Sequence, residues 1–173
     1  DGARLIVIDP RRTVSAEHAE MLVQPRPGTD GALALGVAHA IRERGWIDRE
    51  FVEAHVLGYP EFAAMLEEFP PERAAAISGV PLEQILRLAE AVGTVRPVTI
   101  NAGFGMQRYT NAGQSVRAVL ALLAITGNIG RPGAGWIYAN LQSQIFDAVR
   151  DPIAFYPPAR PDGVARISIS TAR

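Results

Sequence analysis

Apolar residues recur along the chain in two patterns, short continuous runs and runs with helical spacing. Residues 5–8 (Leu-Ile-Val-Ile) form a continuous run that is typical of a parallel strand buried on both faces. The run ends at Asp9-Pro10, because proline cannot donate a hydrogen bond to a strand ladder. Shorter runs predict a second strand at residues 21–24 and a third, buried strand at residues 98–101.

Helical spacing fills the stretches between these strands. The apolar residues of segment 31–44 fall on one helical face, and Gly45 is a typical terminator after it. A further helix opens at residues 80–83, with a proline near its first turn. From Gly127 the sequence predicts irregular chain, followed by a strand at residues 166–170. The predicted helices cover residues 31–44, 48–55, 60–68, 71–77, 80–93 and 114–126.

Strands that alternate with helices imply an α/β fold, namely a three-layer α/β/α, Rossmann-like domain with a mostly parallel sheet. We expect residues 1–173 to form a single such domain. Because strand patterns lie almost at both ends, we also expect the domain to be incomplete and the chain to be a fragment of a longer polypeptide. Ligands of such sheets bind beyond the carboxyl ends of the strands, which singles out residues 9–12, 27–30 and 102–111.

Composition and charge exclude several classes of function. The net charge is −1, so the chain has no basic field that would hold nucleic acid. The longest apolar stretch, residues 116–125, is too short to span a bilayer, and we expect no direct membrane insertion. The chain contains no cysteine, so it cannot ligate an iron–sulfur cluster through thiolates. All 17 basic residues are arginines, which excludes a P-loop lysine.

The turn after the first predicted strand, residues 9–12, has the sequence Asp-Pro-Arg-Arg. A carboxylate at this place can accept hydrogen bonds from a ribose or a purine edge. An arginine can hold a phosphate bidentately or stack on a base. The alternative is a polar turn with solvated arginines, and these residues by themselves favour it.

A second turn, residues 26–31, precedes the first long predicted helix. The free N–H groups at a helix start can bind an anion or another acceptor. Asp30 would disfavour a phosphate but can pair with the two adjacent N–H donors of a guanine. The alternative is ordinary N-capping by Thr29 or Asp30, and chemistry alone favours that alternative.

The glycines after the third predicted strand do not match a common dinucleotide fingerprint. Gly103 and Gly105 are present, but the third glycine of G-x-G-x-x-G is missing, which disfavours an ordinary NAD-binding domain. The three histidines lack metal-ligand spacing, and His39 is expected to be structural because it lies on a predicted helix.

Four blocks, in this order, resemble the molybdopterin-guanine-dinucleotide (MGD) oxidoreductases of the dimethyl-sulfoxide-reductase superfamily. The blocks are residues 7–13, 26–33, 103–111 and 117–135, and the resemblance extends over about residues 2–142. It implies an enzyme with a bis-MGD cofactor and molybdenum or tungsten. This chain would anchor the guanine-nucleotide arm and part of the pterin, and would be inactive alone. The family's metal ligand and iron–sulfur segment lie upstream of the matched region.

The resemblance also implies roles for residues in the first two blocks. Asp9 and Arg11 resemble positions near one nucleotide arm of the cofactor. Gly28, Thr29 and Asp30 resemble the turn that recognises guanine, with Asp30 on the base edge.

In the later blocks the resemblance points to the neighbourhood of the metal centre. Phe104 and Arg108 match positions near the pterin and metal, and Arg108 departs from the glutamine common in formate dehydrogenases and nitrate reductases. Asn140 stands where formate dehydrogenases carry an active-site arginine, which argues against formate as substrate. Arg108 and Asn140 are therefore candidate neighbours of the active site, and no catalytic residue is assigned.

The resemblance implies the remainder of the catalytic subunit as a partner and an iron–sulfur electron-transfer subunit as a second one. It allows either a cytoplasmic location or a periplasmic one reached by twin-arginine export. Two other interpretations stay open. One is a metal-free structural relative in a respiratory complex, and the other is a nucleotide-binding module without a redox role.

Overall fold

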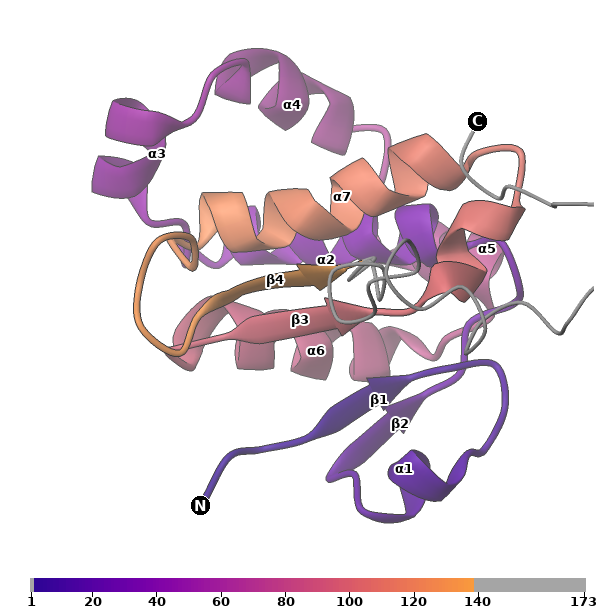
Figure 1. The fold of residues 1–173 in the computed structure, drawn as a ribbon. Coiled ribbons are helices and arrows are strands. Elements are labelled where there is room, and N and C mark those ends of the chain that lie inside the picture. Colours follow the sequence, from indigo (N-terminus) through magenta and orange to yellow (C-terminus); the bar gives the residue numbers. More distant parts are fainter. Residues whose placement is uncertain (1, 139–173) are drawn as a thin grey trace, which may run out of the picture. The chain divides into compact units, whose positions relative to one another are not determined.

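The computed structural model describes residues 2–138 of the chain, and the strand predicted at residues 166–170 lies outside them. Helices and parallel strands alternate along this part (Figure 1). The elements are β1 (Ile6–Ile8), α1 (Val14–Glu17), β2 (Met21–Val23), α2 (Asp30–Glu43), α3 (Arg49–His55), α4 (Tyr59–Leu66), α5 (Pro71–Ser78), α6 (Leu82–Thr94), β3 (Thr99–Ala102), the 3-10 helix η1 (Phe104–Arg108), α7 (Ala112–Ile125) and β4 (Gly135–Tyr138).

Strands β1 and β2 form a two-stranded parallel sheet, joined by a crossover that contains α1. Ile6 pairs with Met21 and Ile8 with Val23. The prediction that the first strand is buried on both faces was wrong, because Leu5 is 44% and Ile8 46% exposed. Among the described residues β1 pairs with β2 alone. A strand at the centre of a wide sheet is covered by neighbours on both sides, and a two-stranded sheet lacks them.

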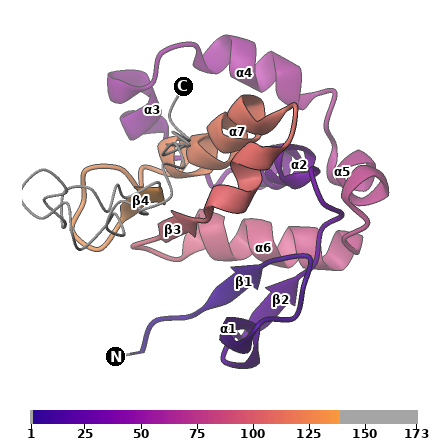
Figure 2. The same ribbon diagram turned by 45° about the vertical axis from the view of Figure 1, so that its right-hand side comes forward.

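Helix α2 lies at the centre of the core and packs against α5, α6 and α7 (Figure 2). Val37 and Ile41 on this helix are fully buried. Gly36 allows α5 to approach closely, because a side-chain carbon there would collide with Ala74. The buried His39 has Nδ1 2.7 Å from the Leu66 carbonyl oxygen, as expected of a structural histidine. The burial of this helix fixes its amino end, where the second candidate turn lies.

Strands β3 and β4 form a second two-stranded parallel sheet, with Ile100 opposite Trp136 and Ala102 opposite Tyr138. The prediction of a buried strand at residues 98–101 was wrong in its burial, because Thr99 and Asn101 are exposed. Within residues 2–138 neither of the two residues belongs to the buried core around α2. Strand β4 was not predicted, since its segment was interpreted as irregular chain.

Buried Asn128 connects the turn after α7 to the start of β3. Its Oδ1 accepts a hydrogen bond from the Val98 backbone N–H at 3.0 Å. Its Nδ2 donates to the Thr126 hydroxyl at 2.8 Å. The glycine-rich segment that follows is thereby held next to β3, where β4 can pair with it.

The α/β class with parallel strands is confirmed. The predicted helices agree with the observed ones to within a residue or two at most ends, and the loop predicted after the third strand contains η1. Within residues 2–138 the strands make two separate sheets instead of one continuous sheet. No helix of this part is long and apolar enough to cross a membrane. The single-domain organisation over residues 1–173 stays a prediction.

Candidate functional site

Asp9 closes the turn at the carboxyl end of β1. Its Oδ1 accepts a hydrogen bond from the Arg11 backbone N–H at 2.7 Å. The Gln24 side chain donates to the Pro10 carbonyl at 3.0 Å and braces the same turn from β2. One carboxylate oxygen of Asp9 is therefore engaged within the turn, and the side chain of Arg11 is exposed, as the polar-turn alternative expects.

The turn between β2 and α2 is held by Arg26. Its guanidinium Nη1 donates to the carbonyl oxygens of Ala76 at 2.9 Å and Ile77 at 3.2 Å, at the end of α5. Its backbone N–H donates to the Ser78 carbonyl at 2.7 Å. Because the guanidinium binds the carbonyl end of α5, Arg26 acts as a structural brace of this turn.

Thr29 occupies the N-cap position of α2 without capping it with its side chain. The Thr29 hydroxyl instead donates backwards to the Arg26 carbonyl at 2.6 Å. Gly28, with φ at +81°, gives the turn a left-handed conformation that other residues rarely adopt. The interpretation that the Thr29 side chain caps the helix is therefore wrong, and the backbone N–H groups of the first turn can bind other acceptors.

Asp30 begins α2 and is half-buried. Burial raises the pKa of its carboxyl, its own backbone N–H acts in the opposite direction, and the nearby negative charge of Asp9 raises the pKa further. Because Asp9 raises the pKa of Asp30, the two carboxyls lie within range of each other's charge. Two acidic groups here repel a phosphate and favour a ligand that presents N–H donors.

The loop after β3 lies against this turn. The Asn111 side chain donates to the Gly28 carbonyl at 3.0 Å. A Cβ on Gly28 would lie 3.1 Å from Cδ1 of the Tyr109 ring, and one on Gly31 would lie 2.9 Å from the Ser115 hydroxyl. Tyr109 and Asn111 fall in segment 102–111, which was predicted to bind a ligand, although neither residue was given a role, and Ser115 was missed. Their contacts join residues far apart in the chain, and no local pattern reveals them.

Aromatic side chains gather where β3 and β4 end. The Phe104 ring lies 6.4 Å from the Tyr138 ring, and Trp136 lies 5.6 Å from Tyr138, measured between ring centroids. The Tyr138 hydroxyl donates to Gln107 Oε1 at 3.3 Å. Trp136 and Tyr138 were missed, because the segment of β4 had been interpreted as irregular, and Gln107 was given no role although it lies in segment 102–111.

The three segments singled out from the sequence adjoin one another. Asp9 acts electrostatically on Asp30, the turn at Gly28 contacts Tyr109, and Arg108 precedes Tyr109 at the exposed end of η1. The structure thus places the turn at residues 28–30 beside Tyr109 and Asn111, and within range of the charge of Asp9. Asn140 lies outside the described residues.

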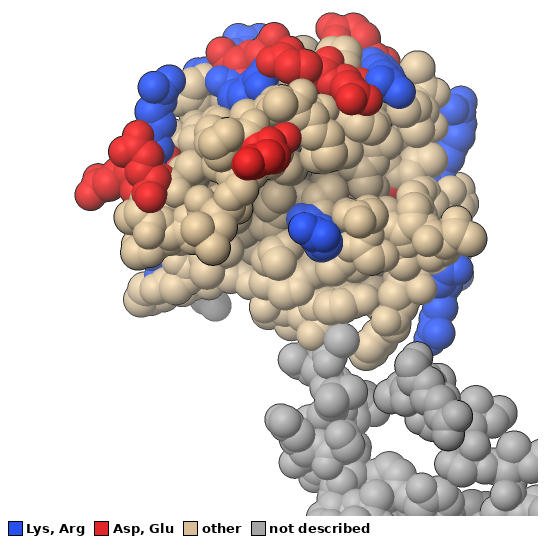
Figure 3. All heavy atoms as spheres, turned by 90° about the horizontal axis from the view of Figure 1, so that it is seen from above, with Lys and Arg blue, Asp and Glu red and all other residues tan. Residues whose placement is uncertain are grey.

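The arrangement offers acceptors and backbone N–H groups, and it offers no evident metal site. Among residues 2–138 no three His, Cys, Asp or Glu side chains are placed to hold a metal ion. In the face seen in Figure 3, acidic and basic side chains intermix along the upper border, and a basic side chain stands near the centre of an otherwise mostly uncharged surface. That face therefore carries no basic patch of the kind that binds nucleic acid.

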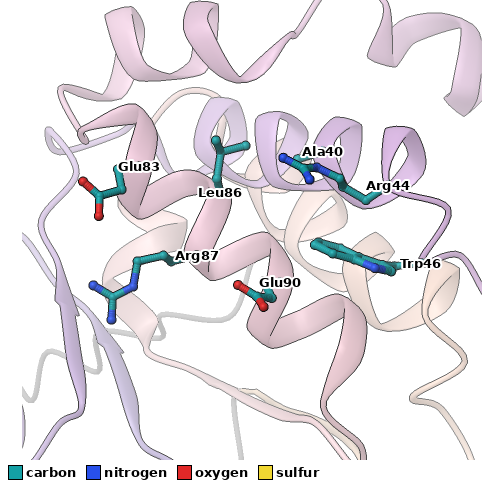
Figure 4. A pocket seen from close by; sticks show the side chains of 7 residues that line it. All are labelled: Ala40, Arg44, Trp46, Glu83, Leu86, Arg87 and Glu90. Carbon is teal, nitrogen blue, oxygen red and sulfur yellow. The ribbon is translucent and has the colours of Figure 1, made fainter.

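A separate surface hollow of about 220 Å³ lies between α2 and α6 (Figure 4). It is near the carboxyl end of α2, about 15 Å along the helix from Asp30 at the usual rise per residue. This hollow is too far from the turns to form part of the candidate site. Its lining residues are Ala40, Arg44, Trp46, Glu83, Leu86, Arg87 and Glu90.

Comparisons with known proteins match most of the chain. The family model described as molybdopterin oxidoreductase matches residues 1–162. The probable oxidoreductase YoaE of Bacillus subtilis is 36% identical over 139 residues, which are 80% of this chain and 20% of that protein. The alpha subunit of the F420-dependent formate dehydrogenase 1 of Methanococcus maripaludis is 36% identical over 78% of this chain and 20% of its own length.

Two further relatives extend the range of activities. Dimethyl sulfoxide reductase DmsA of Escherichia coli is 35% identical over 76% of this chain and 19% of its own length. The solved structure of acetylene hydratase from Pelobacter acetylenicus superposes with a TM-score of 0.73 at 35% identity, covering 77% of this chain and 18% of that one. The chain spans about a fifth of the length of the curated relatives that it matches.

Proposed function

Because the chain belongs to the molybdopterin oxidoreductase family, we propose that it anchors the guanine-nucleotide arm of an MGD cofactor within a larger oxidoreductase. The family implies a molybdopterin with molybdenum or tungsten, and that group would supply the centre where electrons pass to or from the substrate. In this proposal the described residues bind and orient one arm of the cofactor. The complete enzyme would contain the remainder of the catalytic subunit and an iron–sulfur subunit as electron partner.

The residues at the candidate site fit a guanine. A guanine presents two adjacent N–H donors, and the half-buried carboxylate of Asp30 can accept both. Asp9, close enough to affect the pKa of Asp30, adds a second acceptor and opposes a phosphate at this point. The glycine at position 28 lets backbone approach the ligand, and the neighbouring Tyr109 ring offers a face for stacking.

The observation that carries the proposal is the half-buried carboxylate of Asp30 in the first turn of α2, beside a turn that Arg26 and Asn111 brace. The Thr29 hydroxyl bonds backwards to the Arg26 carbonyl, so the Thr29 side chain does not occupy the N–H groups of the first turn. The N–H groups there and the Asp30 carboxylate are complementary to the mixed donors and acceptors along one edge of a purine. Gly28, Thr29 and Asp30 would act as the guanine turn, and Arg108 and Phe104 would lie toward the pterin.

The test is an Asp30→Asn substitution in the full-length enzyme. Replacing the carboxylate by an amide removes one charged acceptor, which should weaken cofactor binding by roughly 1.5–3 kcal/mol. Pterin fluorescence and metal content are measured after dialysis against cofactor-free buffer. Glu83→Gln, in the hollow at the far end of α2, is the matched control and should retain the wild-type content. Equal retention in both variants would remove Asp30 from the guanine turn.

A second candidate activity is addition of water without net redox change. The specific observation in its favour is the likeness to a hydratase, at a TM-score of 0.73. A redox enzyme should reduce or reoxidise an artificial electron dye in step with substrate consumption. Substrate turnover with no change in the dye would favour the hydratase class.

A further inference from the structure

Four uncharged residues form a continuous cluster at the carboxyl ends of β3 and β4. Tyr138 is central, because its ring neighbours both Phe104 and Trp136 and its hydroxyl bonds Gln107. We call these four residues the aromatic wall. Trp136 and Tyr138 lie on one face of β4, while Ile137 between them lies on the other.

The aromatic wall is only partly buried. Phe104 is 50% exposed, although a phenylalanine that only filled the core would be enclosed. The Tyr138–Gln107 hydrogen bond, at 3.3 Å, is long for an O–H···O bond, so either partner can turn to a ligand at small cost. A half-exposed ring beside two neutral hydrogen-bonding groups offers an apolar surface together with polar groups that could orient a ligand.

The position of the aromatic wall relates it to the cofactor turn. Parallel α/β sheets bind ligands beyond the carboxyl ends of their strands, and both strands of this sheet end at the wall. Helix η1 begins at Phe104 and leads directly to Tyr109, which contacts Gly28. The cofactor turn and the aromatic wall are therefore at the two ends of one short segment of chain.

We propose that the aromatic wall lines the substrate side of the site and selects an uncharged organic substrate over a small hydrated anion. This inference rests on the proposed function. Aromatic ring faces carry partial negative charge, so they repel an anion, and they bind an apolar or π-bearing body well. The tyrosine hydroxyl and the glutamine amide supply neutral hydrogen bonds to a polar atom of the substrate. None of the four residues supplies a charge that would compensate an anion.

Arg108 provides the competing possibility, because it follows Gln107 and carries a positive charge. If its guanidinium directed substrate choice, a small anion would bind more tightly than a neutral compound of similar size. The two compounds to compare are therefore an aromatic N-oxide, which is neutral and planar, and nitrate, which is a compact anion.

The experiment is calorimetric titration of the oxidised full-length enzyme, without reductant, with pyridine N-oxide and with sodium nitrate. Pyridine N-oxide should bind more tightly than nitrate, and Phe104→Ala should raise its dissociation constant by roughly two- to tenfold, as expected for one aromatic contact. Phe104→Leu, which keeps an apolar side chain without the ring, should show the same direction. Ile137→Ala, on the opposite face of β4 and 42% exposed in the parent, is the matched control and should change neither constant.

Three results would overturn the inference. These are tighter binding of nitrate that is lost in Arg108→Gln, an unchanged pyridine N-oxide constant in both Phe104 variants, or no pyridine N-oxide binding by the wild type. Pterin and metal content are measured on the same samples. A wild-type enzyme without pterin defeats the proposed function, whereas a fully loaded enzyme that gives any of the three results defeats only the aromatic wall.

Discussion

Substitution of Gly28 by alanine tests whether the turn proposed to bind guanine is held against the loop after β3. Alanine at φ +81° is strained by about 1–2 kcal/mol. Its Cβ would also lie 3.1 Å from the Tyr109 ring, which must move. That movement disturbs the hydrogen bond from Asn111 to the Gly28 carbonyl, a further loss of about 0.5–1.5 kcal/mol. We therefore expect a total loss of about 1.5–3.5 kcal/mol in the free energy of unfolding.

Two other glycines separate these contributions. Gly58 has a similar φ of +75°, but a Cβ there would meet only Glu61, at 3.9 Å, so Gly58→Ala should show the backbone strain alone, about 1–2 kcal/mol. Gly113 lies in α7 with no atom near its missing Cβ, and Gly113→Ala should stabilise the chain by about 0.5–1 kcal/mol. Urea denaturation measures all three, with the slope of the transition as a check that the unfolded state is unchanged.

Cofactor retention adds a functional measurement to the same series. Gly28→Ala should release pterin on dialysis, and Gly58→Ala should not, although both weaken the fold. If Gly28→Ala loses no more stability than Gly58→Ala and keeps its pterin, the contact between Gly28 and Tyr109 stabilises neither the fold nor cofactor binding.

Three further predictions concern single residues. Burial raises the folded-state pKa of Asp30 above its ordinary value of 3.8, so ionisation of this group destabilises the cofactor-free chain as pH rises from 3.8 through the raised pKa. Asp30→Asn should therefore raise the free energy of unfolding of the cofactor-free chain at neutral pH. In urea titrations that gain should vanish below pH 3.8. Arg26→Gln should lose about 1–2 kcal/mol of stability, since it frees the carbonyl end of α5, and Arg26→Lys should recover only part of it. Asn128→Ala should lose about 2–4 kcal/mol, because it leaves the Val98 N–H without its acceptor and removes the buried bond that Asn128 donates to the Thr126 hydroxyl, and a thermal melt that is unchanged would contradict that role.

The local periodicity of apolar residues was sufficient to predict the positions of most helices and of β1 and β2. The stripe of apolar residues in α2 marks its buried face, and Gly45 marks its end. Strand β4 could not be found in this way, because its four residues follow several glycines and gain their conformation by pairing with β3. The burial of β1 was overestimated, since apolar composition does not reveal how many neighbours a strand has.

The candidate site was predictable only in outline. Asp9 and Asp30 could be singled out because each stands at the edge of an element and carries a charge. The bond between Asn111 and Gly28 joins positions 83 apart in the sequence, so no local pattern contains it. The role of Arg26 is also hidden in the sequence, where its guanidinium is as suited to a phosphate as to the carbonyl groups of α5.

The exposed side chains of β1 bear on how this polypeptide behaves when it is produced by itself. Leu5 and Ile8 present apolar surface on a strand that pairs with β2 alone among residues 2–138. Unpaired strand edges with apolar side chains are templates for intermolecular pairing, so concentrated samples should self-associate through this strand. An Ile8→Lys substitution would act as a gatekeeper against such aggregation.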